Sequence, residues 1–148
     1  INETINATSI TVTATASTLT IYSFVNTNPT LPGPTKVRFT FDSNGNLVEE
    51  RWVGTKSGSY WVFTGSATTR TVGGPVENVT GTPAFFTYRD STGAALSPGT
   101  SGLTLAQRKL IATITVNVRI SNTPTTGTAP IELINTIGMP NLHIDSDE

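Results

Sequence analysis

Apolar and polar residues alternate along several stretches of the chain, and this pattern predicts β-strands. Apolar residues occupy every second position of Ile10–Ala16, with threonine between them, which is the period of a half-buried strand. The apolar positions then shift to Leu19 and Ile21, so we expect either a bulge near Ser17–Thr18 or a break between two strands there. Both Ile10–Ala16 and Leu19–Phe24 are therefore predicted to be extended chain.

The most regular alternation lies in Leu110–Ile120. Its even-numbered residues are apolar and share one face, so we predict a central strand with this face in the core. The face consists of Leu110, Ala112, Ile114, Val116, Val118 and Ile120. Other strands are expected at Val37–Phe41, Leu47–Val53, Tyr60–Phe63, Phe85–Arg89 and Ile131–Ile137. Only the short segment Leu103–Lys109 has a composition compatible with a helix.

Two short polar segments predict hairpin turns. Asp42–Asn46 and Asp90–Gly93 each contain an aspartate and a glycine, which tolerates a positive φ, between two strand patterns. The first segment also offers alternating oxygen ligands, as the start of a calcium loop does. An EF-hand loop requires glycine at its sixth position and glutamate at its twelfth, whereas these positions hold Leu47 and Val53 here. We therefore favour the turn.

The composition agrees with a β-rich fold. The chain has 148 residues, which suits one domain, and only 13% of them are charged, with a net charge of −1. It contains 29 threonines and 12 serines, and β-branched threonine fits a pleated sheet better than a helix. We predict a single mainly-β domain over residues 1–148, an antiparallel sheet or sandwich with at most one short helix.

Residues suited to catalysis are scarce. No cysteine is present, which excludes a disulfide scaffold, a thiolate metal site and a cysteine nucleophile. The only histidine, His143, lies in an acidic tail that could bind a metal, although chain ends are usually frayed and solvated. Glu49 and Glu50 are adjacent on a predicted strand, so they point to opposite faces and cannot form the carboxylate pair of a glycosidase. We assign no catalytic, cofactor-binding or metal-ligating residue and expect no enzyme activity.

Other surface features allow two interpretations each. Four aromatic residues could form a sugar-stacking platform, although on a hairpin they more often build the core of a sheet. They are Trp52, Tyr60, Trp61 and Phe63. Glycosylation sequons begin at Asn2, Asn6 and Asn78, but such triplets arise readily by chance in a threonine-rich chain.

The lysines and arginines are scattered singly, which argues against a nucleic-acid-binding face. The sequence contains no run of 18 apolar residues, which is about the length that a membrane-spanning helix needs.

Several segments together resemble one known family. Leu19–Phe24 and then Lys36–Val48 resemble a region of the J-type pseudopilins of type II secretion and the related minor pilins of type IV pili. Later segments are similar to the following family motifs, in the same order, so the resemblance covers nearly the whole chain. These segments are Asn78–Gly93, Gln107–Val118 and Leu133–Leu142. The N-terminal apolar helix typical of the family is absent from this sequence.

The resemblance implies the globular head of a minor pilin or pseudopilin, located in the cell envelope or outside the cell. In that family a processed apolar helix packs into the filament core, and minor members prime assembly with sibling subunits. The expected partners are therefore other pilin or pseudopilin subunits, with no nucleic acid, and with membrane contact only through the helix absent here. No cofactor is expected. The alternative function is a cell-surface β-sandwich binding module or adhesin that recognises carbohydrate through the aromatic hairpin.

An assembly subunit needs a contact surface, and an unpaired sheet edge can supply one through its free N–H and C=O groups. We expect Ile10–Ala16 to be this edge, because it lies near the terminus and has neither charge nor proline to block pairing.

Overall fold

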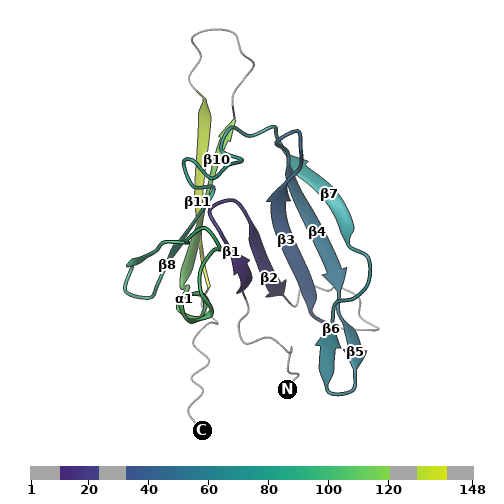
Figure 1. Cartoon of the computed structure of the whole chain (residues 1–148). Coiled ribbons are helices and arrows are strands. Elements are labelled where there is room, and N and C mark those ends of the chain that lie inside the picture. The colour runs from purple at the N-terminus through teal and green to yellow at the C-terminus, as the bar shows by residue number, and fades with distance from the viewer. Residues whose placement is uncertain (1–10, 24–32, 121–129, 140–148) are drawn as a thin grey trace.

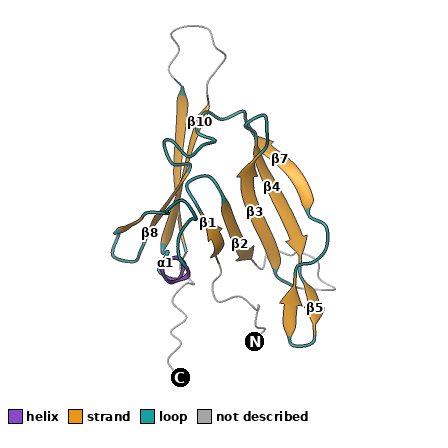
Figure 2. Cartoon of the chain, in the orientation of Figure 1, coloured by secondary structure: helices purple, strands orange, loops and turns teal. Residues whose placement is uncertain are grey.

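The computed structural model describes residues 11–23, 33–120 and 130–139. These residues form two antiparallel β-sheets that face each other, with one short helix beside them (Figures 1 and 2). This arrangement confirms the predicted mainly-β class.

The first sheet has five strands in the order β1-β2-β3-β4-β7, and every neighbouring pair is antiparallel. Its strands are β1 (Thr11–Ala14), β2 (Leu19–Ser23), β3 (Thr35–Phe41), β4 (Leu47–Val53) and β7 (Thr68–Gly73). A hairpin of two short strands, β5 (Thr55–Ser57) and β6 (Tyr60–Val62), follows β4 and lies at one end of this sheet (Figure 1).

The second sheet has four strands in the order β11-β10-β8-β9, also antiparallel. Its strands are β8 (Phe86–Arg89), β9 (Ala95–Leu96), β10 (Thr113–Ile120) and β11 (Ile131–Gly138). The helix α1 (Leu105–Lys109) precedes β10, and Thr104 begins it through a capping box with Gln107. The helix lies within the segment predicted for it, and β10 is a central strand, as predicted.

Turn residues act as predicted at both hairpins. The Asp42 carboxylate accepts hydrogen bonds from the backbone N–H groups of Asn44 (2.8 Å) and Asn46 (2.9 Å), and Gly45 has a φ of 76°. The Asp90 carboxylate accepts in the same way from the N–H groups of Thr92 and Ala94, both at 2.9 Å. Each aspartate therefore holds its own turn closed. Hydrogen bonds from the side chains of Asn46 and Thr92, and then from these backbone N–H groups, favour the ionised form and lower the pKa of Asp42 and Asp90.

The shift of apolar positions after Ala16 is a break between two strands. β1 and β2 pair antiparallel, and the N–H of Thr15 donates to the carbonyl oxygen of Thr18 at 2.9 Å in the turn that joins them. The hydroxyl oxygen of Thr15 also accepts from the N–H of Thr18 at 2.8 Å. A threonine thus closes this turn, which is why the strands can reverse direction without glycine.

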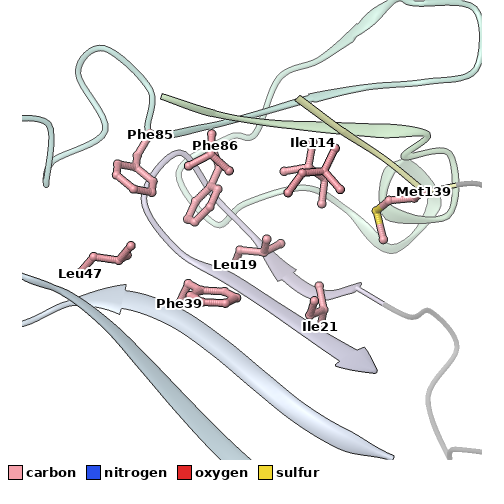
Figure 3. Close-up of a pocket in the computed structure, with 10 residues that line it drawn as sticks. Leu19, Ile21, Phe39, Leu47, Phe85, Phe86, Ile114 and Met139 are labelled. Atoms are coloured by element: carbon pink, nitrogen blue, oxygen red, sulfur yellow. The ribbon is translucent and has the colours of Figure 1, made fainter. Parts of the chain in front are cut away.

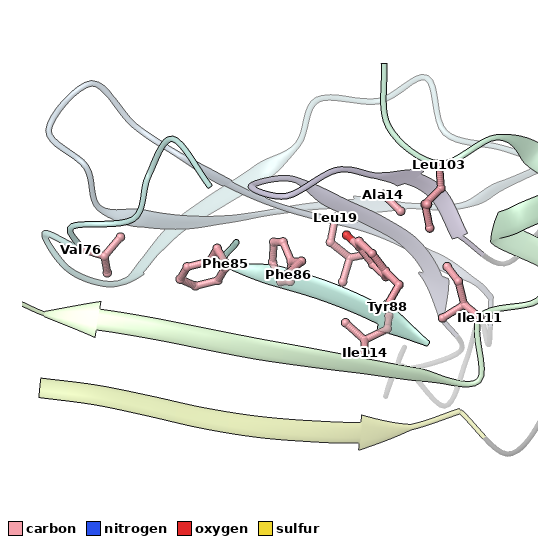
Figure 4. Packing of buried hydrophobic residues seen from close by; sticks show 9 residues of the cluster. All are labelled: Ala14, Leu19, Val76, Phe85, Phe86, Tyr88, Leu103, Ile111 and Ile114. Atoms are coloured by element: carbon pink, nitrogen blue, oxygen red, sulfur yellow. The ribbon is translucent and has the colours of Figure 1, made fainter. Parts of the chain in front are cut away.

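The core lies between the two sheets and is built around aromatic side chains (Figure 4). Phe85 is fully buried and makes edge-to-face contacts with Phe41 and Phe86, with 4.9 Å between ring centroids in each pair. Tyr88 is also buried, and its hydroxyl donates to the carbonyl oxygen of Thr15 at 2.7 Å. Residues of the second sheet therefore fix the turn at the edge of the first.

The start of the central strand differs from the prediction. Leu110 is the C-cap of α1 with its residue surface 57% exposed, whereas Ile111, which is not part of the predicted core face, is fully buried. The C-cap has a helical backbone, so the alternation of a strand begins only after the helix ends. From Ile114 onward the prediction holds, because Ile114 is buried and the later even-numbered residues pack partly buried against the core. These are Val116, Val118 and Ile120.

Candidate functional site

The edge strand β11 is the most unusual surface feature of the described chain. All eight of its residues are exposed, and it pairs only with β10 among the strands of the described ranges. Its four large aliphatic side chains are between 51% and 64% exposed: Ile131, Leu133, Ile134 and Ile137. We call these four residues, with the free backbone edge beside them, the β11 edge. Long apolar edge strands are rare on monomeric proteins because they invite pairing with another chain.

The register with β10 shows which way these side chains point. Ile131, Leu133 and Ile137 lie opposite Ile120, Val118 and Ile114, in that order. Residues directly opposite each other in an antiparallel pair share a face, so these three point to the same side as the core. Ile134 lies opposite Asn117 and points to the other side. The β11 edge therefore exposes apolar groups on both of its faces.

An apolar groove lies between the two sheets (Figure 3), and Ile137 on the inner face of β11 lines part of it. It has a volume of about 230 Å³, and both sheets line it. The first sheet contributes residues such as Ile21, Phe39 and Leu47, and the second contributes Val116 and Ile137. The described residues that line the groove are all apolar, so it suits an aliphatic or aromatic side chain rather than a polar substrate.

The segment that precedes β8 holds β10 in place beside β11. β8 pairs with β10 only from Thr113 to Val116, so the remainder of β10 needs other partners on that side. Asn78, which is fully buried, supplies two of them: its amide nitrogen donates to the Asn117 carbonyl at 2.8 Å, and its amide oxygen accepts from the Arg119 N–H at 3.2 Å. This buried side chain is not available as a glycosylation site, whereas Asn2 and Asn6 lie outside the described residues.

The expected contact strand, Ile10–Ala16, is less open than β11. β1 lies at the edge of its sheet, as expected for that segment. The carbonyl oxygen of Ala14, however, accepts a hydrogen bond from the N–H of Leu103 at 2.8 Å, and Ala14 is buried. The segment before α1 therefore already covers part of this edge. A sequence pattern can indicate an edge strand but not which loop folds back over it.

The aromatic residues of the hairpin region do not join the core, so this expectation was wrong. Trp52 lies beside two cations, with Lys36 Nζ 4.8 Å and Arg38 Cζ 5.5 Å from its ring centroid. The Phe63 ring stacks on Tyr22 at 4.9 Å. These contacts occupy ring faces that a sugar would need, so they do not favour the carbohydrate-binding alternative.

Tyr60 and Trp61 lie on the β5–β6 hairpin, outside the buried core. Tyr60 is exposed, and Trp61 packs so close to Gly33 that a Cβ atom there would lie 2.9 Å from the indole ring. The small residue at position 33 thus lets the hairpin fold against the first sheet.

Three ion pairs occupy the two faces of β4. Glu49 is buried and accepts from Arg51 Nε at 2.6 Å and from Arg70 Nε at 2.9 Å, whereas Glu50 binds Arg38 on the opposite face. The two glutamates therefore point apart, as predicted. Hydrogen bonds from Arg70, and secondarily from Arg51, hold the pKa of Glu49 below its ordinary value despite its burial. Both carboxylates serve as partners of arginine.

The described part of the chain contains neither a metal-binding cluster nor a membrane-spanning helix. Within residues 11–23, 33–120 and 130–139, no three acidic or histidine side chains lie close enough together to hold a metal ion. His143 and its acidic neighbours lie outside these ranges. The same ranges contain no helix that is both long and apolar enough to cross a bilayer.

One signal of the β11 edge is visible in the sequence in retrospect. Leu133 and Ile134 are adjacent, so a strand through them must place an apolar residue on each face.

Comparisons of the chain with protein-family models, with curated proteins and with solved structures give no match.

Proposed function

We propose that this protein is a structural subunit of an extracellular or envelope-spanning filament, of the minor pilin or pseudopilin type. In this proposal it acts through contacts with other subunits and performs no chemical turnover. The observation that carries the proposal is the β11 edge, where a long strand that pairs on one side only, among the described residues, presents four aliphatic residues beside an apolar groove. The order of the sequence segments that resemble the pilin family gives it independent support.

The strand β11 lacks the features that usually protect an exposed edge. Proteins that remain monomeric protect edge strands with lysine, proline, bulges or covering loops. β11 has no lysine and no proline, and its eight residues pair with β10 without a register shift. The residues that line the adjoining groove are apolar as well. A partner strand at this edge would gain main-chain hydrogen bonds, and side chains that enter the groove would supply specificity.

A charge placed on the β11 edge tests this function. Ile134 points away from the core and is 64% exposed, so Ile134→Lys should change the free energy of unfolding by no more than about 0.5 kcal/mol. It should nevertheless block strand pairing and remove the protein from filaments sheared off the cells that produce it. Immunoblots of sheared and cell-bound fractions measure this distribution, and circular dichroism of the purified variant checks its fold.

A matched control is available on the other sheet. Val72 lies on β7, an edge strand of the first sheet, and is 49% exposed. Val72→Lys adds the same charge at a similar degree of exposure and should leave incorporation unchanged. If Ile134→Lys enters filaments as well as the parent chain does, β11 is not the assembly surface and the proposal fails.

A further inference from the structure

The residues of the β11 edge also indicate which partner can occupy it when sibling subunits are absent. We propose that a second copy of this chain pairs antiparallel with β11, with Ile134 on the two-fold axis. The inference rests on the proposed function, because it assigns an occupant to the same edge. It adds a stoichiometry and a register, both of which can be measured on the purified chain.

Charge restricts the ways in which two β11 strands can pair. Glu132 is the only charged residue of the strand, and its carboxylate accepts from the Asn117 side chain at 2.7 Å. Parallel pairing in register would place Glu132 directly beside its own copy. Antiparallel pairing centred on Glu132 would do the same. Like charges directly opposite each other destabilise a sheet, so both arrangements are disfavoured.

The remaining antiparallel registers differ in their side-chain pairs. Pairing about a residue keeps the inner faces of both copies on one side of the joined sheet. A centre at Leu133 would set Glu132 against Ile134. A centre at Asn135 would set Ile134 against Thr136 and leave Ile131 beyond the paired strand.

A centre at Ile134 satisfies every constraint. Ile134 then meets its own copy on the outer face, and Ile131 meets Ile137 of the second copy on the inner face. Glu132 lies opposite Thr136, whose hydroxyl can donate to the carboxylate. All three isoleucines of the strand thus pair with isoleucine, and such apolar cross-strand pairs stabilise a sheet.

The resulting dimer should be reversible. Pairing of two eight-residue strands is smaller than the roughly 20–30 residues a side of a stable interface, so we expect an association that dilution reverses. It would join the two four-stranded sheets into one continuous sheet and cover the free backbone of β11. A sibling subunit with a better-fitting strand could then replace the second copy, so the dimer protects the edge before assembly.

Single cysteines test the register cleanly, because the natural chain has no cysteine. Directly opposite residues of an antiparallel pair lie about 4.5–5.5 Å apart between Cα atoms, within the range that a disulfide can bridge. Under mild oxidation Ile134→Cys should form a linked dimer roughly tenfold or more faster than Val72→Cys, which reports random collision. A mixture of Glu132→Cys and Thr136→Cys chains should link across the pair, whereas each variant alone should not.

Charge variants at Thr136 provide a second readout that needs no cross-link. Thr136→Lys places a cation opposite Glu132 of the second copy and should tighten the dimer in analytical ultracentrifugation. Thr136→Glu loses the same hydrogen bond to Thr115 but opposes like charges, so it should weaken the dimer. A tighter dimer for Thr136→Lys together with a weaker dimer for Thr136→Glu supports the register.

Three results would overturn the inference. Linking of Ile134→Cys no faster than that of Val72→Cys would exclude pairing at this position. Faster self-linking at Leu133→Cys or Asn135→Cys would exclude the register. Equal dimer affinities of the two Thr136 variants would exclude a register in which Thr136 lies opposite Glu132 of the second copy. If these tests fail while Ile134→Lys still abolishes incorporation into filaments, the edge serves sibling subunits alone and only this inference is lost.

Discussion

Replacement of Asn78 with alanine should destabilise the fold strongly, because this one side chain completes the hydrogen bonding of β10. The amide is fully buried and makes three hydrogen bonds, to the carbonyls of Asn117 (2.8 Å) and Pro83 (3.3 Å) and from the Arg119 N–H (3.2 Å). In the variant at least the Asn117 carbonyl and the Arg119 N–H lose this partner. A buried polar group left unpaired costs about 1–3 kcal/mol, so two such groups lower the free energy of unfolding by about 2–6 kcal/mol.

Urea denaturation followed by tryptophan fluorescence measures this loss. The loss is a large part of the roughly 5–15 kcal/mol that stabilises a typical domain, so the midpoint should shift clearly. Thr80→Ala is the matched control: it destroys the same sequon, but Thr80 is exposed, and its replacement should cost no more than about 0.5 kcal/mol. If Asn78→Ala unfolds at the same urea concentration as the parent chain, the buried amide does not support β10 and the reasoning is refuted.

Three further predictions concern the core and the ion pairs. Ile114→Ala should lower the free energy of unfolding by about 2–5 kcal/mol through the cavity it leaves, and Thr115→Ala by much less; a reversed order in chemical denaturation would contradict the register of β10. Tyr88→Phe leaves the Thr15 carbonyl without its 2.7 Å donor and should cost about 1–3 kcal/mol in the same assay. Since the pKa of Glu49 is lowered on folding, its stabilising effect is present above its ordinary pKa of 4.5 and is lost as pH falls through the lowered value. Thermal unfolding of Glu49→Gln should therefore depend less on pH in this acidic range than that of the parent chain, and equal slopes would contradict the assignment.

The hydrophobic pattern predicted most strands, because period-2 alternation is a local property. The segment Ile131–Ile137 became β11 with nearly the predicted bounds, and the turn at Asp42–Asn46 formed as its side chains dictate. The pattern failed where one element gave way to another. At Leu110 the end of a helix interrupted the alternation, and the neighbouring Ile111 took the buried position instead.

The candidate site was less predictable, because it depends on which strands find partners. Alternation shows that a strand has an apolar face, but not whether a second sheet covers that face. The interpretation of Trp52 as core failed for the same reason: its strand is interior to the sheet, yet its ring lies beside Lys36 and Arg38. The open edge at β11 and the closed one at Ala14 are likewise results of tertiary packing.

Backbone hydrogen exchange of β11 within assembled filaments tests the central claim most directly. In the free chain, the amides of Ile131–Gly138 that face away from β10 should exchange rapidly, because the edge is exposed. If β11 is the assembly surface, these amides should become strongly protected in filaments, while those of β7 (Thr68–Gly73), an edge strand of the first sheet, change little. Unchanged exchange in β11 together with new protection in Thr68–Gly73 would contradict the proposed assembly surface.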